Sequence, residues 1–176
     1  MYDRFLKLLV DATSRFRVGN PEDANTEMGP LISADHRNKV AAFVEGTPLF
    51  RGAAPAGPGF WFPPTLVEAS NRDRVAREEV FGPVAAVIPF ADEAEAVRLA
   101  NDTPYGLSGS VWTRDSARAL RMGRAIDAGV LSVNSNSSVR VTTPFGGVKQ
   151  SGLGREGSHY GIDDYVVIKY LCVGGV

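Results

Sequence analysis

Two side chains in the segment Arg77–Pro83 could bind a nucleotide, because they combine a carboxylate with a flat aromatic ring. The carboxylate of Glu79 can accept hydrogen bonds from both hydroxyls of a ribose diol. Phe81, two residues further on, can form a wall beside a flat ring. The residues that follow predict a strand, and ligands of open α/β sheets bind beside strand ends. A second interpretation stays equally open, in which the charges are solvated and Phe81 packs in the core.

A second candidate site is the sequence Pro144-Phe145-Gly146-Gly147. Two adjacent glycines permit a close backbone approach or a positive φ angle, and they hold Phe145 at a fixed angle. The ring of Phe145 is then either a pocket wall or part of a structural turn, and the residues alone leave both interpretations open.

The pattern G-x-G-x-x-G occurs at Gly152, Gly154 and Gly157. In a dinucleotide-binding fold this loop follows a strand, opens a helix and precedes an acidic residue by about 20 positions. Here another glycine-rich loop precedes it, and the chain ends 19 residues after Gly157. We therefore interpret the pattern as a structural loop and not as a phosphate-binding loop.

The single cysteine, Cys172, could be taken for a catalytic nucleophile. A nucleophilic thiol needs a nearby base, a cation or a helix N-terminus to lower its pKa. Cys172 instead lies in a predicted strand near the end of the chain. The pattern favours a packed or spectator thiol, and we predict no catalytic residue in this chain.

Composition excludes several classes of function. The formal net charge is −1 and the pI is about 6.1, with no Lys/Arg run, so nucleic acid is not an expected partner. One cysteine excludes an internal disulfide, and two histidines far apart in sequence predict no metal site. No stretch approaches the ~20 apolar residues of a membrane span, and the charged N-terminus is unlike a secretory signal. We expect a cytoplasmic protein with no membrane partner.

Helical spacing of apolar residues predicts two helices in the first part of the chain. One covers residues 2 to about 16, and the other begins after Ser33, a predicted N-cap, with Val40, Phe43 and Val44 on one face. The Gly-, Pro- and Ala-rich stretch 46–64 is expected to form loop and short strand pieces.

The middle of the chain predicts an α/β core. The apolar runs Val84–Phe90, Leu107–Thr113 and Val130–Asn134 have the composition of short strands. Helical patterns separate them, one beginning near Asp92 and one after Asp115. This alternation predicts an open, mainly parallel sheet with flanking helices and right-handed crossovers.

A last run of β-branched and aromatic residues, Asp164–Val173, predicts a C-terminal strand outside that core. A lone strand leaves its N–H and C=O groups unpaired along both edges, so it must join another sheet. We expect the partner sheet to belong to another domain or subunit.

Four motifs, in this order and spacing, resemble the aldehyde dehydrogenase superfamily: NTEMGPLIS, REEVFGPV, ANDTPYGLSGSVWTRD and PFGGVKQSGLGRE. The ending is similar to succinate-semialdehyde dehydrogenases. The resemblance implies that residues 1–150 are part of the catalytic domain and that residues 151–176 are a C-terminal loop and oligomerisation strand. It covers about the last third of a family member.

The resemblance also implies roles for individual residues. Glu79 matches the glutamate that binds the nicotinamide ribose, and Phe81 matches the aromatic residue beside the nicotinamide ring. Phe145 matches a residue of the aldehyde tunnel, and Asn134 matches the asparagine that ends the strand before the substrate loop. The run from Tyr165 to Cys172 matches the strand through which subunits form homo-oligomers.

Substrate choice depends on the loop before Phe145. Succinate-semialdehyde enzymes carry serines there that hold the substrate carboxylate, whereas this chain has Val139 and Arg140. Arg140 can bind a carboxylate bidentately in their place, or it can be a surface charge.

The implied reaction is oxidation of an aldehyde with NAD or NADP. In family members the Rossmann domain, the general base, the oxyanion-hole asparagine and the nucleophilic cysteine lie upstream of the part that this chain matches. We therefore expect the chain alone to be inactive and to bind no cofactor. Two alternatives remain, a non-catalytic assembly module and one chain of a split enzyme.

Overall fold

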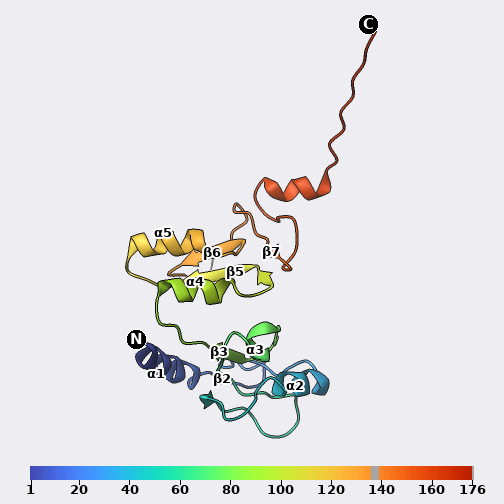
Figure 1. Cartoon of the computed structure of the whole chain (residues 1–176). Helices are drawn as coiled ribbons and strands as arrows, with labels where there is room; N and C mark the ends of the chain where they lie inside the picture. Colours follow the sequence, from blue (N-terminus) through green and yellow to red (C-terminus); the bar gives the residue numbers. More distant parts are fainter. Residues whose placement is uncertain (136–138, 176) are drawn as a thin grey trace. The chain divides into compact units, whose positions relative to one another are not determined.

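The computed structural model describes residues 1–135 and 139–175. They form two compact units, Met1–Phe90 and Ala91–Val176, shown in Figure 1. Each unit has its own sheet and helices. The predicted boundary at residue 150, between the catalytic-domain part and the C-terminal loop and strand, rests on the family resemblance and stays a prediction.

The first unit is built around a three-stranded sheet with the order β1-β2-β3. β1 (Phe50–Arg51) is antiparallel to β2 (Thr65–Glu68), and β2 is parallel to β3 (Val84–Val87). The helices of this unit are α1 (Tyr2–Thr13), α2 (Ala34–Ala41) and the single turn α3 (Arg74–Arg77) between β2 and β3.

The core of the first unit is apolar. Its buried side chains include one from α2, one just beyond it, and several from β2, β3 and their flanks: Val40, Phe43, Phe62, Leu66, Val67, Ala69 and Val87. Burial of this kind supplies about 25 cal/mol per Å² of apolar surface removed from water. Helix α1 has no buried residue, and the hydroxyl of Tyr2 donates to Glu68 at 2.9 Å.

The second unit is built around the parallel pair β5 (Ser108–Val111) and β6 (Val130–Val133). Helix α5 (Ser116–Ala125) connects the two strands, and α4 (Glu93–Asn101) precedes them. A short antiparallel pair, β4 (Tyr105–Gly106) with β7 (Val148–Lys149), leads to the glycine-rich loop. A 3-10 helix, η1 (Tyr160–Tyr165), follows that loop.

The predicted helix starts are confirmed by their caps. Ser33 accepts a hydrogen bond from the backbone N–H of His36 at 3.1 Å. Asp92 and Asp115 cap α4 and α5 in the same way, at 2.8 and 3.1 Å. These side chains satisfy N–H groups that have no partner inside the helix.

The predicted α/β class with open, mainly parallel sheets is confirmed, but the expected pairing of the three apolar runs is wrong. Strand β3 pairs with β2, whereas β5 pairs with β6 in a separate sheet. The reason is the short connection through α3, which returns the chain beside β2. The run 65–68 borders the Gly- and Pro-rich stretch, so its strand character was missed.

The predicted C-terminal strand is also partly wrong. Asp164 and Tyr165 belong to η1, and an Asp164 carboxylate oxygen accepts from the backbone N–H of Arg155 at 3.3 Å. Beyond them the backbone is extended at Val166 (φ −122°, ψ 153°), and within the described residues it pairs with no strand. A strand needs a partner edge, and this segment is paired with none of the described sheets.

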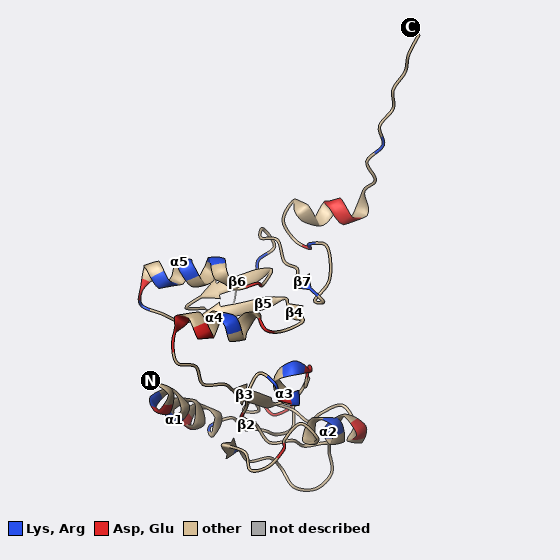
Figure 2. Cartoon of the chain, in the orientation of Figure 1, with Lys and Arg blue, Asp and Glu red and all other residues tan. Residues whose placement is uncertain are grey.

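The carboxylate of Glu93 connects helices α4 and α5 of the second unit. Glu93, at the start of α4, accepts from Arg121 at 2.8 and 3.0 Å and from Arg118 at 2.9 Å. Figure 2 shows the acidic start of α4 and the basic residues along α5. Hydrogen bonds from Arg121 and then Arg118 lower the pKa of Glu93 from 4.5 to about 2.

We expect Glu93 to make the second unit acid-sensitive. Because its pKa is lower in the folded state, its contribution is complete above pH 4.5 and is lost as the pH falls towards 2. Glu93→Gln should lower the thermal midpoint at pH 7 and flatten its pH dependence between pH 4.5 and 2, followed by circular dichroism. Glu95→Gln, on the same helix, should change both less. Equal acid sensitivity in Glu93→Gln and the unmodified chain would contradict this role.

None of the helices among the described residues has the length and apolar character required to span a bilayer.

Candidate functional site

The segment that carries Glu79 and Phe81 is a tight turn between α3 and β3. Phe81 has φ 51°, in the left-handed region that residues other than glycine seldom adopt. Its side chain is 75% exposed. The interpretation in which Phe81 fills the core is therefore wrong, and the ring is available to a ligand.

Helix α2 holds this turn from one side. The Nε2 atom of His36 lies 2.9 Å from the carbonyl oxygen of Phe81, and the two rings stack at 6.3 Å with an interplanar angle of 30°. A Cβ atom on Gly82 would lie 2.6 Å from Val40 of the same helix. Only glycine permits so close an approach, which explains the Phe-Gly pair.

Strand β2 holds the turn from the other side. The backbone N–H of Thr65 donates to the carbonyl of Pro83 at 2.9 Å, and the N–H of Val84 donates to Gly82 at 2.8 Å. Thr65 is fully buried and begins β2. The turn is thus anchored to the sheet one residue before β3 begins.

Two neighbouring glutamates in this segment have different surroundings. Glu78 is paired with Arg74, whose Nε lies 3.1 Å from its carboxylate, and the guanidinium of Arg74 lies 4.2 Å above the ring of Phe43. Glu79 is exposed, and within the described part of the chain it forms no hydrogen bond or ion pair through its carboxylate. The Glu79 carboxylate is therefore free to accept hydroxyl groups of a ligand.

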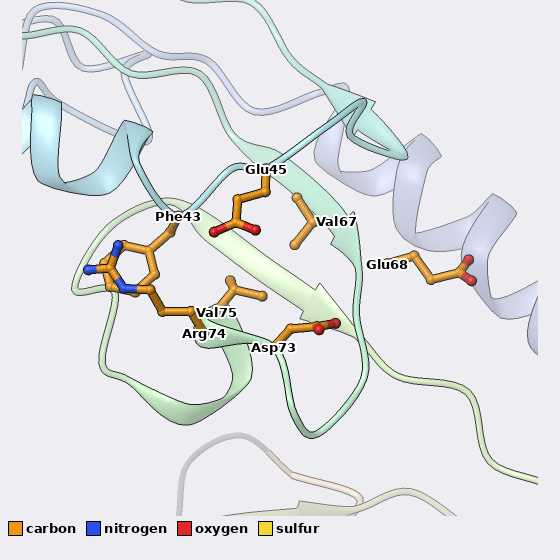
Figure 3. A pocket seen from close by; sticks show the side chains of 7 residues that line it. All are labelled: Phe43, Glu45, Val67, Glu68, Asp73, Arg74 and Val75. Carbon is orange, nitrogen blue, oxygen red and sulfur yellow. The ribbon is translucent and has the colours of Figure 1, made fainter.

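A small cavity of about 200 Å³ lies in the same unit but includes neither Glu79 nor Phe81. Figure 3 shows Glu45 and Val67 at its wall and the side chain of Arg74 lying along Phe43. Arg74 is already engaged by Phe43 and Glu78, and neither predicted site residue of this unit lines the cavity. We do not assign it to the site.

The second candidate, Phe145, is held by the loop that follows it. Phe145 and Glu156 exchange two backbone hydrogen bonds of 2.8 Å, which form an isolated antiparallel bridge. The guanidinium of Arg155 donates to the carbonyls of Gly147 and Gly154 at 2.8 and 2.7 Å. The Phe145–Glu156 bridge therefore closes the loop between these two residues, and it fixes the backbone of the half-buried Phe145.

The glycines of this loop serve packing. A Cβ on Gly129 would collide with the Gly146 carbonyl, and a Cβ on Gly146 would lie 2.5 Å from the Gly154 carbonyl oxygen, so neither position has space for a side chain. Gly154 (φ 79°) packs against the Asp164 carboxylate, and a Cβ on Gly157 (φ 71°) would lie 2.7 Å from the Thr143 carbonyl. The loop follows a two-residue antiparallel strand and leads into a 3-10 helix. This context favours the structural interpretation of G-x-G-x-x-G.

Arg140 is exposed and begins a turn. Its backbone carbonyl accepts from the hydroxyl of Thr143 at 3.0 Å and from the Thr143 N–H at 3.0 Å. Its guanidinium forms no ion pair among residues 1–135 and 139–175. The backbone of Arg140 is thus held by the turn, and its guanidinium has no ion-pair partner among the described residues that would compete with an anionic ligand.

The family model described as "Aldehyde dehydrogenase family" matches residues 1–171 of this chain. The chain belongs to the aldehyde dehydrogenase family. This confirms the resemblance seen in the four sequence motifs.

Named relatives of this aldehyde dehydrogenase segment act on different aldehydes. It is 42% identical to a 3-sulfolactaldehyde dehydrogenase of Pseudomonas putida, with 100% of the chain and 38% of the relative covered. It is 40% identical to a succinate-semialdehyde dehydrogenase [NADP(+)] of Escherichia coli, over 99% and 38%. The chain thus spans about 38% of the length of these relatives.

Solved structures agree with the sequence match. Betaine aldehyde dehydrogenase of Staphylococcus aureus, in complex with NAD+, superposes with a TM-score of 0.86 at 38% identity. The match covers 94% of this chain and 35% of that one. PnpE of Pseudomonas sp. WBC-3 gives a TM-score of 0.87 at 42% identity, covering 93% and 36%.

Asn134 closes the parallel pair of this aldehyde dehydrogenase segment. It has φ 52°, and its side-chain amide exchanges two hydrogen bonds with the backbone of Thr113, at 2.9 and 2.8 Å. It thereby links the C-terminal ends of β5 and β6, just before the loop that leads to Arg140. Its visible role is to hold the strand ends together.

We expect Asn134→Ala to destabilise the chain by about 1–2 kcal/mol, because it removes two hydrogen bonds and because alanine tolerates the left-handed conformation less well than asparagine. Asn134→Gly should cost less, since glycine adopts positive φ freely. Urea unfolding followed by circular dichroism measures both. An alanine variant as stable as the unmodified chain would show that the amide bonds contribute nothing.

Two residues around the candidate site were missed by the sequence analysis: His36 and Arg155. Each forms its hydrogen bond with a backbone carbonyl, which every residue carries, so neither forms a recognisable motif with its partner. The only signal in the sequence was the predicted cap at Ser33, which places His36 in the first turn of α2.

Proposed function

We propose that this chain supplies the nicotinamide-ribose side and part of the aldehyde-binding wall of an NAD(P)-dependent aldehyde dehydrogenase. The observation that carries the proposal is the pairing of an exposed Phe81 ring with a free Glu79 carboxylate on one anchored turn. A flat ring and a hydroxyl acceptor two residues apart fit one end of a dinucleotide. A solved relative of the chain is in complex with NAD+.

Each residue has a defined task in this proposal. The bound nicotinamide supplies the acceptor for the hydride. Glu79 accepts hydrogen bonds from the ribose hydroxyls and fixes the rotation of the sugar, while Phe81 presents its face or edge to the ring. Phe145 lines the path of the aldehyde and excludes water from it. None of these residues is a nucleophile.

The nucleophile is proposed to come from outside these 176 residues. The one thiol of the chain, Cys172, is exposed in the C-terminal segment and distant in sequence from both site segments. We therefore propose that the chain alone does not oxidise aldehydes, and that a preceding polypeptide segment completes the site.

The substrate is proposed to be an aldehyde with an anionic group at its far end. Arg140 offers a free guanidinium in the turn before Phe145. Two of the relatives named above act on 3-sulfolactaldehyde and on succinate semialdehyde. A planar guanidinium can bind a carboxylate or a sulfonate with two parallel hydrogen bonds.

We expect Arg140→Ala to weaken the use of succinate semialdehyde about tenfold in kcat/KM, which corresponds to one charge-assisted hydrogen bond. Butanal, which has no anionic group, should be used equally well by both proteins. The assay follows NAD(P)H absorbance in the completed enzyme described below, with Arg114→Ala as the control. An equal loss with both aldehydes would contradict substrate recognition by Arg140.

The main proposal is tested by completing the site. The part of the E. coli succinate-semialdehyde dehydrogenase that precedes the matched segment can be joined to this chain, which is 40% identical to the part replaced. We expect NAD(P)H formation by this completed enzyme and none by the chain alone. Turnover by the pure 176-residue chain would overturn the proposal. A correctly folded completed enzyme that lacks activity would also count against it.

The C-terminal segment supports a second candidate function, a non-catalytic assembly module. Val167 and Ile168 are 94% and 96% exposed, and the segment around them has no partner strand within the described residues. Oligomers formed by the chain without activity would favour this candidate. Activity on co-expression with an upstream polypeptide, without covalent linkage, would instead favour one chain of a split enzyme.

A further inference from the structure

The Phe81 turn has an energetic problem that the rest of the chain must solve. A phenylalanine in the left-handed region brings its Cβ close to its own carbonyl oxygen, so the conformation is disfavoured. The ring is also 75% exposed, and packing therefore does not fix its direction. Without a further contact the turn would relax and the ring would sample several rotamers.

His36 is the side chain that makes this contact. Its Nε2 atom lies 2.9 Å from the Phe81 carbonyl oxygen, and a carbonyl oxygen can only accept a hydrogen bond. The Nε2 atom therefore carries the proton. The same imidazole stacks against the Phe81 ring at 6.3 Å, so one side chain touches both the backbone and the ring.

The helix that carries His36 is itself firmly placed. Ser33 caps α2 through the N–H of His36, and Val40 and Phe43 are buried at its other end. Val40 also limits how Gly82 approaches the helix. The imidazole is thus supported at the first turn of α2, and the turn at 81–82 contacts the helix at two points.

We propose that His36 is a positioning residue, which holds the Phe81 ring at the angle required to stack on a nicotinamide ring. The inference rests on the proposed function, because it assigns a role to a residue that does not itself touch the cofactor. Its consequence is that the geometry at the nicotinamide is set from α2, 45 residues away in sequence. A change at His36 should weaken nicotinamide binding while the chain remains folded.

The test uses the 176-residue chain labelled with ¹⁵N and the probe nicotinamide mononucleotide, which carries the ring, ribose and phosphate but no adenosine. The expectation that the chain alone binds no cofactor concerns the whole dinucleotide, whereas this probe is only the half that the Phe81 turn is proposed to contact. We expect the amide signals of Glu79, Phe81 and Gly82 to shift on titration, with a dissociation constant on the order of 1 mM. His36→Ala should weaken binding about three- to tenfold, as expected for one lost hydrogen bond and ring contact. Adenosine monophosphate, which lacks nicotinamide, should cause no shift at the turn.

Two variants separate positioning from general stability. His36→Gln keeps an N–H donor at similar reach, and we expect it to restore binding to within about twofold of the unmodified chain. His159→Ala removes the other histidine, which contacts Tyr160 in the second unit, and should leave binding unchanged. Thermal midpoints of all variants are measured in parallel, and binding is compared at a temperature where each is folded.

The outcomes are distinguishable. Binding by the unmodified chain that His36→Ala leaves unchanged overturns the positioning role and leaves the proposed function intact. Weak binding by His36→Gln as well as His36→Ala also overturns it, because the donor would then be irrelevant. No shift at Glu79 and Phe81 in the unmodified chain, or equal shifts with adenosine monophosphate, overturns the proposed function together with this inference.

Discussion

Glu79→Gln in the completed enzyme is expected to lower kcat/KM for NAD(P)+ by about ten- to a hundredfold. In the proposed site the carboxylate would accept the ribose hydroxyls through charge-assisted hydrogen bonds, which contribute roughly 1.5–3 kcal/mol each, whereas a neutral amide accepts them less strongly. A misplaced ribose also moves the nicotinamide carbon away from the reacting aldehyde, and small displacements are costly in hydride transfer. The assay is NAD(P)H absorbance at varied cofactor concentration.

The neighbouring residue provides a matched control for this prediction. Glu78→Gln makes the same chemical change one position earlier, but it removes a partner of Arg74 and leaves Glu79 in place. We expect its kcat/KM to stay within about twofold, since an exposed ion pair contributes little. If Glu79→Gln lowered the thermal midpoint while turnover stayed unchanged, Glu79 would be a structural residue and not a cofactor ligand.

Ile168→Pro is expected to convert oligomers of this chain into monomers. The segment from Val166 to Val173 is extended and rich in exposed apolar side chains, so we propose that it adds as a strand to another subunit's sheet. Proline removes a backbone donor and cannot sit inside a paired strand. Loss of about two ladder hydrogen bonds and the local packing should weaken association roughly ten- to a hundredfold.

Light scattering coupled to size-exclusion chromatography measures this change over a range of protein concentrations. Gly174→Pro places the same residue beyond the apolar run and should leave the mass of the assembly unchanged. Circular dichroism of each variant verifies that the two units remain folded. An Ile168→Pro chain with the same assembly mass as the unmodified chain would show that this segment is not the contact.

Local elements were predictable from the sequence because their signals are local. The caps at Ser33, Asp92 and Asp115 each depend on a side chain and an N–H three residues later. Sheet pairing was less accessible. The residues of the apolar run at 84–87 do not indicate that its partner strand is the run at 65–68, because that pairing depends on the length of the connection through α3.

The candidate site shows the same division. The residue types at Glu79 and Phe81 left a nucleotide-binding and a structural interpretation equally open, and only the backbone angle and exposure of Phe81 show that its ring is not part of the core. The support from His36 was not accessible, because its partner is a carbonyl oxygen and every residue carries one. The interval from Asp164 to Tyr165 became a 3-10 helix because Asp164 reaches back to Arg155, a contact that β propensity does not report.

The division of the chain at residue 90 has a consequence for its synthesis. All strand pairings of the first unit lie between residues 50 and 87, so they can form as soon as this part leaves the ribosome. The 55 residues from Phe90 to Phe145 (145 minus 90) take roughly 3–11 s to translate at about 5–20 residues per second. Small sheets with short connections close much faster than that. The turn that carries Phe81 would therefore be assembled on the nascent polypeptide before the codon for Phe145 is read.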